Sequence, residues 1–405
     1  MPLPTANLRP SNAFVFRELS DAEMRIGLEM FPSGVPAETH ELPRTRAFIE
    51  QGIESGLHIG AQAYVSIRGQ AVATLAMGES RPGIALTADT LMLWLSSTKP
   101  VAAVAIMQLE ERKLLALDDS VASHIPEFGN HDKRSVMIRH LLTHTVGFQP
   151  VDVNPLEMNW DTIIERICDA RLQPEWPPGQ RAGYQPSVSW YILGELVRRT
   201  DGRHFSAYAR QEIFEKLGMR DSWVGMPVDV YRAYGDRIAL MPEMRRTSRR
   251  VQRYSTEAGA TACVPGGNGY GPMRELAMLY ETLLGGGTRD GVRVLSEASV
   301  EQMTARQRVG MFDETFRHTM DWGLGLIINS NRYGPETVPY GYGRHASERA
   351  FGHGGSQSSV GFADPEHGLV VAIALNGMPG ERKHNARIRE INSAIYEDLG
   401  LDRGQ

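Results

Sequence analysis

The sequence predicts a mixed α/β fold of the α+β type, in which an antiparallel sheet is flanked by helices and a mostly helical region is inserted. Strand-like runs gather near both ends of the chain. Residues 61–67 and 71–77 form a predicted hairpin, and 324–329, 358–363 and 369–375 are apolar runs near the C-terminus. Strands that follow one another closely favour an antiparallel sheet over a doubly wound one.

Helical periodicity fills the segments between and around these strands. Residues 113–225 are mainly helical in pattern, with turn sequences such as Pro177-Pro178-Gly179. Further helices are expected at 21–30, 44–55, 101–111, 273–284 and 386–399. We divide the chain, with approximate boundaries, into an N-terminal extension (1–42), a sheet region (43–112 and 226–405) and a helical region (113–225).

Segment 229–275 is harder to interpret because it is dense in Arg, Tyr, Gly and Met. It includes an arginine-rich run at 245–250. We expect a solvated loop or lid here, in preference to a dedicated site for an anionic substrate.

Bulk composition excludes several classes of function. The 405 residues carry a net charge of -5, so no basic excess exists to neutralise a nucleic acid. No run of about 18 apolar residues occurs, and no membrane span is expected. The N-terminus lacks a basic start followed by an apolar run, which predicts a cytoplasmic protein. The oligomeric state is not predictable from these features.

Potential metal ligands are sparse. The two cysteines, Cys168 and Cys263, are too far apart in the sequence for a CxxC pair. His140 and His144 have helical i, i+4 spacing, but no Glu follows His140 and no third ligand is evident. We therefore expect structural histidines, no metal and no organic cofactor.

One short motif could carry nucleophilic chemistry. Ser96 and Lys99 lie one helical turn apart, at the start of the helix expected at 101–111. A serine hydroxyl needs a neighbouring base and a stabilised oxyanion, and free N–H groups at a helix start favour negative charge. The apolar flanks of this motif are unusual for a surface lysine. They favour a catalytic pair over an N-cap serine followed by an exposed lysine.

Several segments, in order, resemble the class C β-lactamases and their esterase relatives, the family VIII carboxylesterases. Residues 93–129, LWLSSTKPVAAVAIMQLEERKLLALDDSVASHIPEFG, resemble the nucleophile region of that family. Residues 177–202 resemble its tyrosine motif, and 351–368, FGHGGSQSSVGFADPEHG, resemble its third motif. Further similar landmarks are HLLTHTVGF at 140–148, Leu217-Gly218-Met219 and Trp322-Gly323-Leu324-Gly325, and the resemblance spans about 44–400.

The resemblance implies the fold of the β-lactamase and penicillin-binding-protein superfamily, and a role for each matching residue. Ser96 would be the acylated nucleophile, and Lys99 would accept or relay its proton. Tyr184, held as or near a phenolate by Lys99, would be the general base and then the acid. The backbone N–H groups of Ser96 and Ser356 would form the oxyanion hole. The substrate would lie along His353, Gly354 and Gly355, where a side chain would block its approach to the backbone.

Two departures from the β-lactamase pattern bear on the substrate. Pro186 stands where the tyrosine motif of β-lactamases has an Asn, and His353 replaces the Lys of their third motif. Both changes disfavour β-lactam hydrolysis and D-amino peptidase activity, as does the expected cytoplasmic location.

Four functional hypotheses remain open at this point. The first is hydrolysis of a small ester or amide through an acyl-Ser96 intermediate. The second is transfer of the same acyl group to an amine or alcohol acceptor in a biosynthetic pathway. β-Lactamase or peptidase activity is disfavoured, and so is a non-catalytic binding protein, because Ser96, Lys99 and Tyr184 are all present.

Overall fold

A large antiparallel sheet is the centre of the computed structural model, which describes residues 40–244 and 250–402. The predicted hairpin and the last two predicted strands are adjacent in this sheet, which confirms the predicted α+β architecture. From edge to edge the strands are β3 (Ile84–Ala85), β2 (Gln70–Arg81), β1 (Gly60–Ile67), β14 (Leu369–Leu375), β13 (Ser359–Asp364), β12 (Phe351–Gly354), β11 (Ile327–Ile328), β10 (His318–Trp322) and β9 (Arg308–Asp313).

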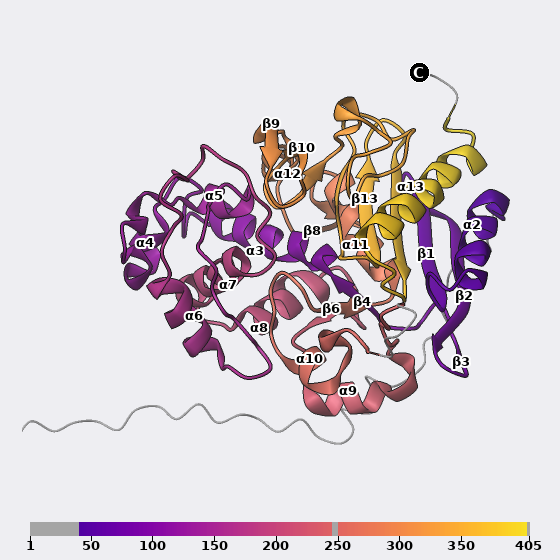
Figure 1. Cartoon of the computed structure of the whole chain (residues 1–405), viewed down its shortest axis with the longest axis horizontal. Coiled ribbons are helices and arrows are strands. Elements are labelled where there is room, and N and C mark those ends of the chain that lie inside the picture. The colour runs from indigo at the N-terminus through magenta and orange to yellow at the C-terminus, as the bar shows by residue number, and fades with distance from the viewer. Residues whose placement is uncertain (1–39, 245–249, 403–405) are drawn as a thin grey trace, which may run out of the picture. The chain divides into compact units, whose positions relative to one another are not determined.

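Helices cover both faces of this sheet. Helices α2 (Pro43–Glu54) and α13 (Glu381–Asp398) pack together on one face, and α11 (Met273–Leu284) packs on the other against β1, β13 and β14 (Figure 1). Strand β14 reads as a continuous apolar run because alternate side chains enter two different cores.

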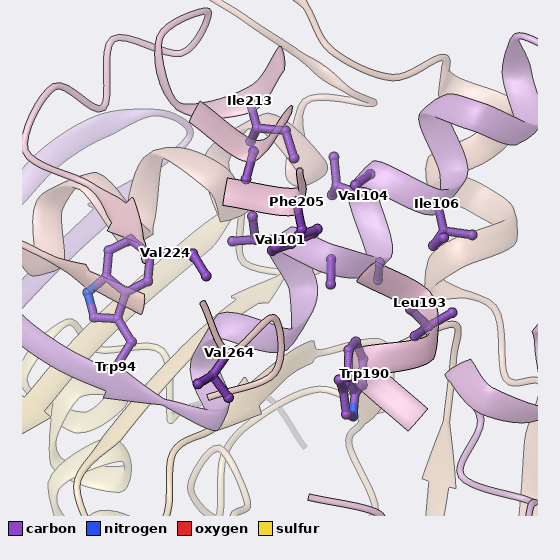
Figure 2. Close-up of a cluster of buried hydrophobic side chains, with 14 of the residues drawn as sticks. Trp94, Val101, Val104, Ile106, Trp190, Leu193, Phe205, Ile213, Val224 and Val264 are labelled. Atoms are coloured by element: carbon purple, nitrogen blue, oxygen red, sulfur yellow. The ribbon is translucent and has the colours of Figure 1, made fainter. Parts of the chain in front are cut away.

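The core on the α11 side of the sheet continues into the helical region. Helix α3 (Lys99–Glu111) and helix α7 (Val188–Asp201) cross there, with Val101, Val104, Trp190 and Leu193 in one cluster (Figure 2). The other helices are α4 (Val121–His124), α5 (Ile138–Leu142), α6 (Trp160–Asp169), α8 (Phe205–Ala209), α9 (Val228–Tyr234), α10 (Glu257–Thr261) and α12 (Glu297–Thr304). Because one core extends through both predicted regions, the domain division stays a prediction.

A second, smaller sheet corrects the prediction for segment 229–275. Its strands are β4 (Met92–Leu95), β6 (Gly269–Gly271) and β5 (Trp223–Val224), with β6 in the middle. Strand β6 is buried and pairs with the strand that leads into Ser96. Residues 264–273 are therefore interior structure, and the expected solvated loop or lid is wrong for this part, whereas 235–237 and 250–251 are exposed.

Some predicted boundaries also change. The strand expected at 324–329 is reduced to β11, because Gly325 has φ 72° and its N–H bonds to the Leu142 carbonyl oxygen. The helix expected at 386–399 begins earlier, at Glu381, just after Gly380 with φ 103°. The helix expected at 21–30 and the arginines at 245–249 lie outside the described residues. None of the described helices is long and apolar enough to cross a bilayer.

Candidate active site

The turn that carries Ser96 has a strained backbone at the end of β4. Leu95 has φ 48° although it is not glycine, and such a conformation costs about 1–3 kcal/mol. The Thr98 hydroxyl donates to the Leu95 carbonyl oxygen at 2.6 Å and accepts the Gly269 N–H at 2.8 Å. Strand β6 thereby fixes the turn, a short 3₁₀ segment at Ser96–Thr98 from which α3 continues.

Ser97 connects this turn to the third motif. Its hydroxyl donates to the His353 carbonyl oxygen at 3.0 Å and lies 3.0 Å from Ser359 Oγ. The Ser359 hydroxyl in turn donates to the Trp94 carbonyl oxygen at 2.5 Å. These buried bonds hold the nucleophile turn against strands β12 and β13.

Lys99 is buried beside Ser96 with three oxygen atoms around its Nζ. The atom lies 3.0 Å from Ser96 Oγ, 2.9 Å from the Pro186 carbonyl oxygen and 2.7 Å from the Gly266 carbonyl oxygen. Within the described residues no carboxylate forms an ion pair with it. Because the ammonium form would lose its water here, burial lowers the pKa of Lys99 well below its usual range.

These contacts orient the lone pair of the Lys99 amine. A neutral amine has two N–H groups and one lone pair, and a backbone carbonyl can only accept. The two carbonyls therefore take the two N–H groups, and the lone pair points at Ser96 Oγ. This geometry suits an amine that receives the proton of the serine hydroxyl.

Tyr184 makes the second contact with Ser96. Its hydroxyl donates to Ser96 Oγ at 2.8 Å. Burial raises the pKa of this phenol, and the nearby carboxylates of Asp313 and Glu381 raise it further. Burial therefore favours the protonated phenol beside Ser96, and the phenolate expected from the resemblance stays a prediction.

A buried ion pair positions Tyr184. The Asp313 Oδ1 atom accepts the backbone N–H groups of Tyr184, Thr315 and Phe316 at 2.9–3.1 Å. Its Oδ2 atom accepts from Arg308 Nη2 at 2.8 Å, and the two side chains are 0% and 1% exposed. The β9–β10 hairpin that carries this pair was not predicted from the sequence.

His144 packs beside Tyr184 in an aromatic cluster. Its ring lies 4.7 Å from the Tyr184 ring and 4.6 Å from the Trp322 ring, and its Nδ1 accepts the Gln185 N–H at 3.0 Å. Burial holds its pKa well below the usual range, so the ring is neutral. Among the described residues no group of His, Cys, Asp and Glu could hold a metal ion.

The third motif lies next to the nucleophile turn, and internal packing gives a reason for its glycines, while their predicted role along the substrate stays a prediction. A Cβ atom on Gly354 would lie 2.5 Å from the Tyr340 ring, and one on Gly355 would lie 2.3 Å from the Trp94 carbonyl oxygen. Both glycines are therefore required by packing inside the protein. His353 is 1% exposed, and burial lowers its pKa to about 3, so its imidazole is neutral.

The two backbone N–H groups of the predicted oxyanion hole have no protein acceptor in the part of the chain that the structure describes. Within the described residues, neither the Ser96 N–H nor the Ser356 N–H donates to another protein group. Helix α13 holds the turn that carries Ser356: Gln357 accepts the Gly380 N–H at 2.6 Å, and its carbonyl oxygen accepts from Arg387 at 2.8 Å. This arrangement suits the predicted oxyanion hole.

The structure brings the predicted Ser96, Lys99, Tyr184, His353 and Ser356 to one place. It adds contributors that the sequence analysis missed, among them the carbonyl groups of Pro186 and Gly266 and the side chains of His144, Arg308, Asp313 and Glu381. Every residue has a backbone carbonyl, so the sequence cannot show which carbonyls line the site. Only the buried Asp and Arg could have been noticed in the sequence, as charged residues in apolar surroundings.

A serine between a buried lysine and a tyrosine, on an antiparallel α+β scaffold, is the arrangement of a serine hydrolase. The chain belongs to the beta-lactamase family, whose family model matches residues 45–395. It is 26% identical over 316 residues to the esterase/beta-lactamase LipL of Mycobacterium tuberculosis, which covers 72% of this chain and 70% of that protein.

Solved structures agree with this assignment. A penicillin-binding protein homolog from Caulobacter crescentus superposes with a TM-score of 0.74 at 29% identity, covering 88% of this chain and 97% of that one. A family VIII carboxylesterase gives a TM-score of 0.71 at 27% identity, covering 89% and 98%. The family and the fold expected from the sequence motifs are confirmed.

Proposed function

We propose that this protein hydrolyses a small ester or amide through an acyl intermediate on Ser96. The observation that carries the proposal is the position of Ser96 Oγ, 3.0 Å from Lys99 Nζ and 2.8 Å from the Tyr184 hydroxyl. Esterases among the relatives support an ester substrate.

The chemistry follows from the charge states of these groups. The neutral amine of Lys99 takes the proton of Ser96 as Oγ attacks the carbonyl carbon, and the N–H groups of Ser96 and Ser356 stabilise the oxyanion. When the bond to the leaving group breaks, the Tyr184 hydroxyl delivers a proton to the leaving atom, and the proton on Lys99 replaces it. Water then attacks the acyl-enzyme with the same groups in reverse. Assigning Lys99 as the base and Tyr184 as the acid revises the roles expected from the resemblance.

Labelling with a fluorophosphonate, read by intact mass, tests the nucleophile. We expect one adduct on the native protein and none on Ser96→Ala, which should also lose turnover of a short-chain p-nitrophenyl ester. Ser123→Ala, a change at an exposed serine of α4, is the control and should label like the native protein. An unlabelled native protein without turnover would exclude the proposal. Faster ester turnover with an added amine would instead favour acyl transfer.

Replacing Tyr184 by Phe should reduce kcat/KM for the ester about 10²- to 10³-fold, because the proton donor to the leaving group is lost. Steady-state kinetics and thermal melting check this. Tyr191→Phe is the matched control, because the Tyr191 hydroxyl is buried without a partner among the described residues. The acid role would be wrong if Tyr184→Phe kept activity within threefold of native.

A further inference from the structure

A carboxylate lies next to the proposed oxyanion hole. Glu381, the first residue of α13, is exposed, and its Oε1 accepts from the Ser356 hydroxyl at 3.2 Å. Its Oε2 accepts from the Tyr340 hydroxyl. Ser356 also carries one of the N–H groups of the predicted oxyanion hole. The carboxylate that contacts its hydroxyl is therefore expected to lie close to the reacting carbonyl.

Among residues 40–244 and 250–402, no cationic side chain forms an ion pair with Glu381. Both of its hydrogen-bond donors are uncharged hydroxyls, and no salt bridge reaches it from the described part of the chain. The neighbouring motif supplies no cation either, since His353 is a buried neutral imidazole. Burial also disfavours the ammonium form of Lys99. The charge of this carboxylate raises the pKa of Tyr184, so its electrostatic field acts at the centre of the site.

We propose that Glu381 is a specificity residue that selects substrates with an ammonium group close to the scissile carbonyl and disfavours carboxylates. The inference rests on the proposed acyl-Ser96 function and adds the charge of its substrate. The remaining lone pairs of the carboxylate can accept from an amine or lie against a quaternary ammonium group. At a separation of about 5 Å in water-exposed surroundings, the attraction should change kcat/KM roughly three- to tenfold and weaken with salt.

Isosteric substrate pairs test this charge selectivity on both sides of the scissile bond. For the acyl side, p-nitrophenyl 4-(trimethylammonio)butanoate is compared with p-nitrophenyl 5,5-dimethylhexanoate. For the leaving side, acetylthiocholine is compared with 3,3-dimethylbutyl thioacetate. The readout is the ratio of kcat/KM for the cationic substrate to that for its neutral isostere.

We expect the native ratio to fall roughly three- to tenfold in Glu381→Gln for at least one pair, and the pair affected identifies the side on which the cation binds. Glu297→Gln is the control, because Glu297 is also an exposed acid in the first turn of a helix, and its ratio should equal the native one. Glu381→Lys should reverse the preference, toward an anionic p-nitrophenyl hydrogen glutarate.

The inference is overturned if both ratios are the same in the native protein, Glu381→Gln and Glu381→Lys. It is also overturned if Glu297→Gln lowers the ratio equally. Failure of the proposed function has a different signature: none of the four substrates is turned over and the fluorophosphonate does not label Ser96. Circular dichroism of each variant separates a folding defect from a change in selectivity.

Discussion

Replacing Lys99 by methionine should reduce kcat/KM for an ester by about 10³-fold while the chain still folds. Methionine fills a similar volume but has no lone pair to take the Ser96 proton, and positioned general bases contribute about 10²- to 10⁴-fold. Kinetics with a p-nitrophenyl ester and the rate of fluorophosphonate labelling measure the loss.

A second buried lysine provides the control for this change. Lys133 is also fully buried, and its Nζ donates to the carbonyl oxygens of Asn130, Cys168 and Ala170. Its hydrogen bonds go to carbonyl groups and none goes to a serine, so Lys133→Met should lower the melting temperature without a comparable loss of activity. If the two variants lost activity equally, Lys99 would be a structural residue.

The pH dependence of the native protein follows from the lowered pKa of Lys99. Its neutral form is the active one, so kcat/KM should rise with pH through that pKa. At pH values between this lowered pKa and the ordinary lysine pKa of about 10.4, Lys99 is protonated in the unfolded chain more than in the folded protein. The contribution of Lys99 to the free energy of unfolding therefore falls as pH falls. The melting temperature of Lys99→Met relative to native should therefore increase as pH is lowered from about 10 toward neutrality. A constant difference would mean that Lys99 is charged in the folded protein.

The second large effect is expected at Asp313. Asp313→Asn should destabilise the protein by about 3–5 kcal/mol, because it leaves the buried Arg308 guanidinium without its counter-ion. The amide oxygen can still accept the N–H of Tyr184, so a chain that folds should keep part of its activity. Asp313→Ala removes that acceptor as well and should lose more activity at similar stability. Thermal melting and ester kinetics of the pair separate the two effects.

A double variant checks the origin of this destabilisation. Combining Asp313→Asn with Arg308→Met removes both charges, so the double variant should be more stable than Asp313→Asn alone. If the double variant were instead destabilised by the sum of the single changes, the ion pair would not be the cause.

Sequence patterns predicted the central sheet because its strands carry the apolar signal in the side chains themselves. Strand β14 was predicted with its observed bounds, since it is buried on both faces. The β9–β10 hairpin was missed because exposed residues such as Val309 and Phe312 interrupt any regular pattern. Part of segment 229–275 was misjudged, because its glycines and tyrosines are typical of a loop. In the structure, β6 within this segment pairs with β4 and is buried.

The sequence by itself identified the side chains that we propose to react: Ser96, Lys99 and Tyr184 are singled out by residue type, spacing and resemblance. Only the tertiary structure decided their protonation states and their neighbours. Burial lowers the pKa of Lys99 and raises the pKa of Tyr184, and burial depends on residues far away in the chain. The carbonyl oxygens of Pro186 and Gly266 orient the amine, yet every residue has such an oxygen, so position in space alone selects them.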